Sequence, residues 1–105
     1  MRVVGVTVLL CMAAAAAQAA PDAARAELGG QLYVQMCRQC HGAELRSPGV
    51  GSFDLRQFPP GDSQRFHAAV MHGKNAMPAH DDILTDEDID ALFAYVVATQ
   101  QAQKP

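Results

Sequence analysis

One pentapeptide, Cys37-Arg38-Gln39-Cys40-His41, constrains this 105-residue chain more than any other feature. Positions i, i+3 and i+4 share one face of a helix, so a single helical turn would point both thiols and the imidazole of His41 the same way. The C-x-x-C-H spacing is the attachment signal for a haem bound through two thioethers. We therefore expect one haem c, attached covalently through Cys37 and Cys40 and ligated by His41.

The cysteine pair has three alternative interpretations: a thioredoxin-like dithiol, half of a zinc site, and a lone disulfide. A thioredoxin-like dithiol needs a βαβ framework, and this sequence has no alternating run of strand length. A zinc site needs a second Cys/His pair at finger-like spacing, which the sequence also lacks. A lone disulfide is the remaining alternative, since thiols of exported proteins are normally oxidised.

A haem iron held by one histidine has a sixth position, and its occupant separates an electron carrier from a ligand-binding or catalytic haem protein. The candidate ligands are Met71, His72, Met77 and His80, with Met36 and His67 ranked behind them. Met77 is favoured, because Pro78 directly after it stiffens the loop and prevents a helix there. Met71 stands at helical spacing from apolar residues, where methionine usually fills the core. We therefore expect His41 and Met77 as the two metal ligands.

The N-terminus has the order of a signal peptide. Met1 and Arg2 form a short positive region, Val3 to Met12 an apolar run, and Ala13 to Ala20 a stretch of small residues. We expect residues 1–19 to be a signal peptide cleaved after Ala19, and residues 20–105 to be the exported domain. A retained anchor is the alternative, although the apolar run is shorter than the roughly 20 residues of a spanning helix. After cleavage we expect no stable membrane insertion.

Charge argues against one class of partner, and composition indicates how the core is completed. The formal net charge is −3, and export would also remove the positive charge of Arg2. An acidic surface argues against nucleic acid as a partner. The chain has four phenylalanines, two tyrosines and no tryptophan. A domain this small usually needs a staple, a metal or a cofactor to complete its core, and a haem would serve.

The apolar pattern predicts an all-α fold. The first helix is expected from Pro21 to about Met36, with Asp22 as its cap and an apolar residue on every fourth position. Glycines and prolines between residues 42 and 61 predict a loop. A short helix then follows, capped by Asp62 or Ser63 and ended by Gly73.

The last helix has the clearest local signal. Thr85 is its expected N-cap, and three acidic residues occupy its first turn, where the helix dipole favours anions. Leu84 and Ile89 are spaced as a hydrophobic staple. The polar tail after Thr99 is expected to fray.

Taken together, these residues resemble the class I c-type cytochromes over about Gly29 to Ala98. The shared features are Gly29, Tyr33, the haem motif with Gly42, the pair Met77-Pro78 and the final helix from Leu84 to Val96. The resemblance implies a small cytochrome c fold, in which the first and last helices cross at Gly29 over the haem, with Tyr33 and either Phe93 or Tyr95 packed around the crossing. It also implies that a loop proline, matched by Pro48, accepts the Nδ1 proton of the haem histidine.

A second, narrower resemblance concerns the segment from Asp54 to Pro59. With Arg65-Phe66 and Met77-Pro78, this segment is similar to the cytochromes found with pyrroloquinoline-quinone alcohol dehydrogenases. That similarity implies a contact between Arg56 and a haem propionate, the alternative being a solvated loop arginine. Asn75, next to the ligand loop, is a candidate donor to the methionine sulfur.

These features predict a soluble periplasmic electron carrier and not an enzyme. Its haem would shuttle single electrons from a donor dehydrogenase, with a quinoprotein alcohol dehydrogenase as the candidate, to an acceptor oxidase or another cytochrome. An acidic surface would favour basic docking patches on these partners. The alternative is a ligand-binding or catalytic haem protein with an open or labile sixth position.

Overall fold

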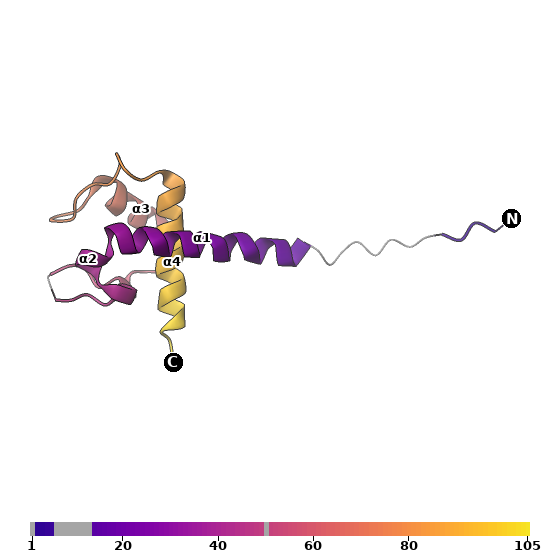
Figure 1. Cartoon of the computed structure of the whole chain (residues 1–105), viewed down its shortest axis with the longest axis horizontal. Helices are drawn as coiled ribbons and strands as arrows, with labels where there is room; N and C mark the ends of the chain where they lie inside the picture. Colours follow the sequence, from indigo (N-terminus) through magenta and orange to yellow (C-terminus); the bar gives the residue numbers. More distant parts are fainter. Residues whose placement is uncertain (1, 6–13, 50) are drawn as a thin grey trace.

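A computed structural model describes residues 2–5, 14–49 and 51–105, with the backbone alone described for residues 14–21. The elements in this part of the chain are α1 (Ala14–Met36), α2 (Arg38–His41), the 3-10 turns η1 (Ala43–Leu45) and η2 (Leu55–Gln57), α3 (Ser63–His72) and α4 (Asp86–Ala102). They are arranged around α4, as Figure 1 shows. The described residues form no strand, and the predicted all-α fold is confirmed.

The first helix starts earlier than predicted. It begins at Ala14, so Asp22 lies inside α1 rather than at its cap, with its carboxylate 4.0 Å from the guanidinium of Arg25. The prediction was wrong because it took Pro21 as the first helical residue, whereas the alanines before it have the highest helix propensity and extend the helix.

The predicted signal peptide falls partly outside the described residues. Positions 6–13, which hold most of its apolar run, are among those not described, so its end at Ala19 stays a prediction. Within residues 14–49 and 51–105, no helix combines the length and the apolar character needed to cross a bilayer.

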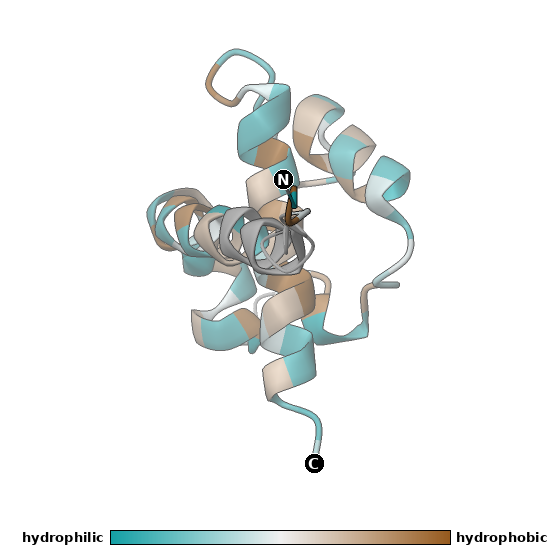
Figure 2. Ribbon diagram, turned by 90° about the vertical axis from the view of Figure 1, so that its right-hand side faces the viewer, coloured by the Kyte–Doolittle hydropathy of each residue, from teal (hydrophilic) through white to brown (hydrophobic). Residues whose placement is uncertain are grey.

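α1 and α4 cross at Gly29. A Cβ on this glycine would lie 1.8 Å from the backbone oxygen of Ala91, so only glycine permits the approach. Figure 2 looks along α1 and shows α4 running across it. Beside the crossing, Tyr33 packs against Tyr95 with ring centroids 5.1 Å apart, whereas Phe93 joins a separate group of phenylalanine rings. The predicted crossing is confirmed, with Tyr95 as the partner of Tyr33.

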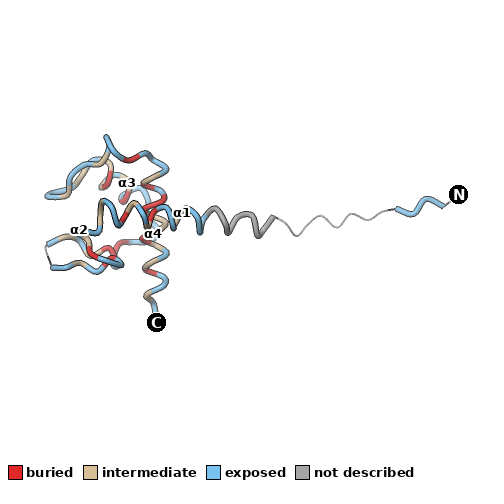
Figure 3. Tube along the Cα trace, in the orientation of Figure 1, coloured by how far each residue is buried: buried red, intermediate tan, exposed pale blue. Residues whose placement is uncertain are grey.

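The core gathers where α4 meets the other elements. Figure 3 shows buried positions on α4 and on the segments packed around it. A T-shaped contact of Phe58 with Phe66 and another with Phe93 join η2, α3 and α4. The core residues are Tyr33, Leu45, Leu55, Phe58, Phe66, Val70, Leu84, Ile89, Leu92 and Val96.

The predicted bounds of α3 and the predicted start of α4 are confirmed. The side chain of Asp62 accepts from the backbone N–H of Arg65 at the start of α3, and Gly73 ends that helix with φ 77°. Thr85 and Asp88 form a reciprocal capping box at the start of α4, with distances of 3.0 and 3.1 Å. These signals are local in sequence, which is why the sequence alone could locate them.

The C-terminal turn of α4 does not fray, contrary to the prediction. The helix continues to Ala102, and Gln100 within it is buried. The amide of Gln100 donates to the backbone oxygens of Leu55 and Phe58, and Gln103 donates to that of Glu44. The prediction was wrong because it treated polar residues as solvated, whereas a buried amide with carbonyl partners is stable in a core.

Candidate functional site

The C-x-x-C-H segment begins where α1 ends. The N–H of Cys37 donates to the backbone oxygen of Tyr33 at 2.9 Å. The carbonyl of Cys37 accepts from the N–H groups of Cys40 at 3.2 Å and His41 at 2.9 Å. Gly42 then redirects the chain with φ 84°. The motif therefore occupies one tight turn, as its spacing predicts.

The two thiols are free and differ in their surroundings. Cys37 is half-buried and packs against the hydrophobic core, whereas Cys40 is exposed. Burial, and secondarily the neighbouring Cys40, raises the pKa of the Cys37 thiol to about 11. The thiolate is the reactive form of cysteine. The raised pKa therefore makes Cys37 less reactive at neutral pH than an ordinary thiol.

The imidazole of His41 is held by one backbone carbonyl. Its Nδ1 lies 3.0 Å from the oxygen of Phe53, twelve residues further along the chain. A carbonyl oxygen can only accept, so Nδ1 carries a proton, and in the neutral ring the lone pair is then on Nε2. This corrects the expectation for Pro48, which lies beside Gly42 instead. Positive φ angles at two glycines, Gly49 and Gly51, carry the chain beyond Pro48 before it returns to His41.

Two hydroxyl groups support the backbone around the motif. Tyr33 donates to the carbonyl of Gly42 at 2.6 Å, and Ser52 donates to that of Cys40 at 2.6 Å. Burial raises the pKa of the Tyr33 phenol, which therefore stays protonated as a donor. The family resemblance implied only packing for Tyr33, and no sequence signal marked Ser52, because neither hydrogen bond follows from spacing along a helix.

Met77 lies in the turn between α3 and α4. Lys74 and Met77 exchange backbone hydrogen bonds of 3.1 and 2.9 Å, which close a tight turn. The side chain of Met77 is half-buried and packs against the same hydrophobic core as Cys37. Met71 also packs there, as expected of a core methionine. The fold thus brings the candidate methionine and the cysteine motif to one core.

The histidines considered as alternative ligands have different environments. His72 is exposed, whereas His80 is half-buried. Within the described part of the chain, Nδ1 of His80 is buried without a hydrogen-bond partner. His67 pairs with the carboxylate of Asp86 at 3.0 Å.

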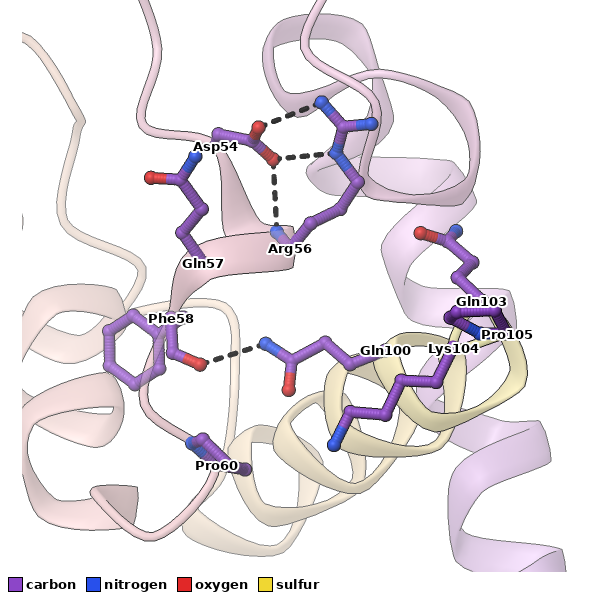
Figure 4. Close-up of a pocket in the computed structure, with 9 residues that line it drawn as sticks. All are labelled: Asp54, Arg56, Gln57, Phe58, Pro60, Gln100, Gln103, Lys104 and Pro105. Carbon is purple, nitrogen blue, oxygen red and sulfur yellow. Dashed lines mark hydrogen bonds and ion pairs between the residues drawn. The ribbon is translucent and has the colours of Figure 1, made fainter.

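Asn75 and Arg56 each have a local explanation. Asn75 is exposed at the tip of the Met77 turn with φ 54°, a conformation that asparagine tolerates better than most residues. Arg56 donates through Nε and Nη2 to the carboxylate of Asp54, at 2.9 and 2.8 Å. These bonds, drawn in Figure 4, raise the pKa of Arg56 and lower that of Asp54. Arg56 is exposed and Asp54 half-buried, and both line an open pocket of about 510 Å³.

The donor set fits a c-type haem. Two free thiols lie on one turn, an imidazole presents Nε2, and a half-buried thioether faces the same apolar core. Imidazole and thioether are the ligand pair that c-type cytochromes use. In the described ranges, no group of three or more His, Cys, Asp or Glu side chains could hold a bare metal ion.

Comparison with known proteins places the chain in a family. The family model described as cytochrome c oxidase, cbb3-type, subunit III matches residues 24–96. The chain is 34% identical over 76 residues to cytochrome c6 of Bryopsis maxima, covering 67% of this chain and 86% of that protein. It is 31% identical over 77 residues to cytochrome c550 of Pseudomonas aeruginosa, covering 67% and 52%. No solved structure matches significantly.

A further relative is much longer than this chain. The quinohemoprotein alcohol dehydrogenase ADH IIB of Pseudomonas putida is 35% identical over 85 residues, which are 78% of this chain but 12% of the dehydrogenase. The small relatives are cytochromes and support an electron-carrier role. The chain therefore belongs to the family of c-type cytochrome domains described as cytochrome c oxidase, cbb3-type, subunit III, and its cofactor is a covalently bound haem c.

Proposed function

We propose that this chain carries single electrons on one haem attached through Cys37 and Cys40 and ligated by His41 and Met77. The observation that carries the proposal is the shared core of Cys37 and Met77, beside an imidazole whose Nε2 is free. The haem supplies one-electron chemistry. The small c6 and c550 relatives support the same role.

The protein's own groups hold and tune the ligands. The Phe53 carbonyl selects the tautomer of His41 and strengthens its Nε2 as a donor. The Lys74–Met77 turn restricts the position of the thioether. A methionine opposite a histidine raises the reduction potential of the iron, which suits an electron carrier. Contacts of Arg56 with a propionate and of Asn75 with the methionine sulfur stay predictions.

We further infer export to the periplasm. The order of positive, apolar and small residues in positions 1–20 supports a signal peptide over residues 1–19, cleaved after Ala19, and a domain over residues 20–105. The intact mass of the product recovered from the periplasm tests this. It should equal residues 20–105 plus one haem, and a product that retains residue 1 would support a membrane anchor instead.

The proposed donor is a dehydrogenase, and a quinoprotein alcohol dehydrogenase is the leading candidate. The 35% identity to part of a quinohemoprotein alcohol dehydrogenase supports this class. The proposed acceptor is an oxidase or another cytochrome. Stopped-flow oxidation of the reduced dehydrogenase by this protein should slow as salt screens the acidic surface. A rate that is independent of salt would argue against electrostatic docking.

The sixth ligand is tested with a pair of methionine variants. The oxidised wild-type protein should show the red sulfur-to-iron charge-transfer band, which Met77→Ala should abolish. Met71→Ala is the matched control, because Met71 packs against the same core, and it should keep the band. Loss of the band in Met71→Ala alone would assign the ligand to Met71. A high-spin wild-type spectrum would favour the alternative function of ligand binding or catalysis.

A further inference from the structure

Gln100 is a buried polar residue on the last turns of α4. It is 9% exposed, and its Nε2 lies 2.8 Å from the carbonyl oxygens of both Leu55 and Phe58. A carboxamide has two N–H donors, so one side chain can serve both carbonyls. The contact with Phe58 is drawn in Figure 4. Gln100 therefore ties α4 to a segment more than 40 residues earlier in the chain, 45 from Leu55 and 42 from Phe58.

The segment that contains Leu55 and Phe58 needs such a partner. Leu55 begins the 3-10 turn η2 and Phe58 directly follows it, in a region that has little regular structure. The Leu55 oxygen already accepts from the N–H of Phe58 within the turn, at 3.2 Å, but a segment with so little regular structure still needs partners from other elements to hold it in place. The two hydrogen bonds from Gln100 meet this need and fix the segment on α4. We call these two hydrogen bonds the clamp.

The same segment carries the acceptor for the haem histidine. Phe53 is separated from Leu55 only by Asp54, and its carbonyl accepts from Nδ1 of His41. Phe53 is 48% exposed, and its ring packs edge-on against that of Phe58, which belongs to the same segment. The position of the Phe53 carbonyl is therefore set by the backbone on either side of it. Ser52 holds the preceding side through the carbonyl of Cys40, and Gln100 holds the following side.

We propose that Gln100 is a positioning residue for the haem histidine, holding residues 53–58 on α4 so that the Phe53 carbonyl stays on Nδ1 of His41. The inference rests on the proposed ligation by His41. Loss of the clamp weakens the Nδ1–H···O bond, so the imidazole becomes a weaker donor. A weaker donor stabilises the oxidised metal less, and the reduction potential should rise.

Two other glutamines near the C-terminal end of α4 serve as comparisons. Gln101 is exposed and adjacent in sequence, so Gln101→Met changes the same residue type without touching the clamp. Gln103 donates to the carbonyl of Glu44, which lies in η1 and not in residues 53–58. Gln103→Met therefore removes a different tertiary hydrogen bond and leaves residues 53–58 in place.

The test compares Gln100→Met, Gln101→Met and Gln103→Met as holoproteins. The readouts are the exchange rate of the His41 Nδ1 proton by NMR, the reduction potential and the charge-transfer band. Gln100→Met should keep the band, raise the potential and speed exchange roughly 5- to 30-fold, the range expected for one or two lost hydrogen bonds. The two comparison variants should change the exchange rate and potential much less.

Several results would overturn the inference. One is a Gln100→Met protein that keeps the band with unchanged exchange and potential, and another is an equal effect in all three variants. If Gln100→Met does not accumulate, the wild-type holoprotein still decides. Its Gln100 side-chain N–H protons should exchange much more slowly than those of Gln101, and equal rates would refute the clamp. A wild-type protein without His41 ligation would instead refute the proposed function, before any variant is compared.

Discussion

Substitution of Gly29 by alanine should destabilise the fold strongly. A Cβ at this position would lie 1.8 Å from the oxygen and 2.4 Å from the carbon of the Ala91 carbonyl. Both atoms belong to the backbone of α4, so no side-chain rotation relieves the clash. The helices would have to separate by about 1.2 Å, the difference between 1.8 Å and the 3.0 Å below which Cβ contacts are not found.

The expected magnitude follows from two opposing effects. Alanine in place of a helical glycine gains about 0.5–1 kcal/mol of helix propensity. Separating α1 from α4 disturbs the packing of Tyr33 and Leu92 next to the crossing, at a cost we place at about 3–4 kcal/mol, comparable to truncating a large core side chain. The net loss should be about 2–3 kcal/mol. For a domain of this size that corresponds to a fall in Tm of roughly 10–20 °C.

Gly30→Ala is the matched control on the same helix. Its Cβ would meet the ring of Tyr95 at 3.1 Å, and this side chain can shift by a few tenths of an ångström. The free energy of unfolding of this variant should stay within about 1 kcal/mol of wild type. Guanidinium titrations of the three holoproteins measure both effects. A Gly29→Ala protein as stable as wild type, or an equal loss in both variants, would refute the close-crossing explanation.

Three further predictions concern single contacts. Tyr33→Phe removes the donor to the Gly42 carbonyl and should lower the free energy of unfolding by about 1–3 kcal/mol. Because burial raises the pKa of Tyr33, this residue's contribution is complete below about pH 10 and is lost as the pH rises through the folded-state value. The alkaline fall in stability should thus be shallower in Tyr33→Phe, and identical slopes would contradict the assignment. Thr85→Ala removes half of the capping box and should cost about 1 kcal/mol in the same titration, a neutral result arguing against the cap. Gly73→Ala puts a Cβ 2.6 Å from the Met77 oxygen at φ 77°, so the charge-transfer band should weaken, whereas an unchanged band would show that this turn does not position Met77.

The sequence predicted the features that depend on neighbours along the chain. The capping box at Thr85, the stop at Gly73 and the turn of the haem motif all join residues no more than four positions apart. Backbone hydrogen bonding in a helix operates over the same range, so residue spacing alone is sufficient. The crossing at Gly29 was predicted by resemblance to a family, because spacing along one helix does not identify the partner helix.

The sequence did not predict which groups meet across the loops. It matched Pro48 as the acceptor for His41, whereas the structure uses the Phe53 carbonyl. Every residue except proline has the same backbone donor and acceptor, so side-chain identity does not mark which carbonyl will be used. The outcome depends on the path of the loop, which the positive φ angles at Gly49 and Gly51 redirect.

Residue types and spacing by themselves determined the cofactor class, the all-α fold, both ends of α3 and the start of α4. Only the tertiary structure decided that Gln100 is buried and that its amide reaches Leu55 and Phe58. In isolation, a glutamine near a chain end favours solvent, because burying an unpaired amide is costly. Here that cost is removed by two carbonyls brought within reach when α4 packs against residues 55–58, a proximity that arises only once the chain has folded.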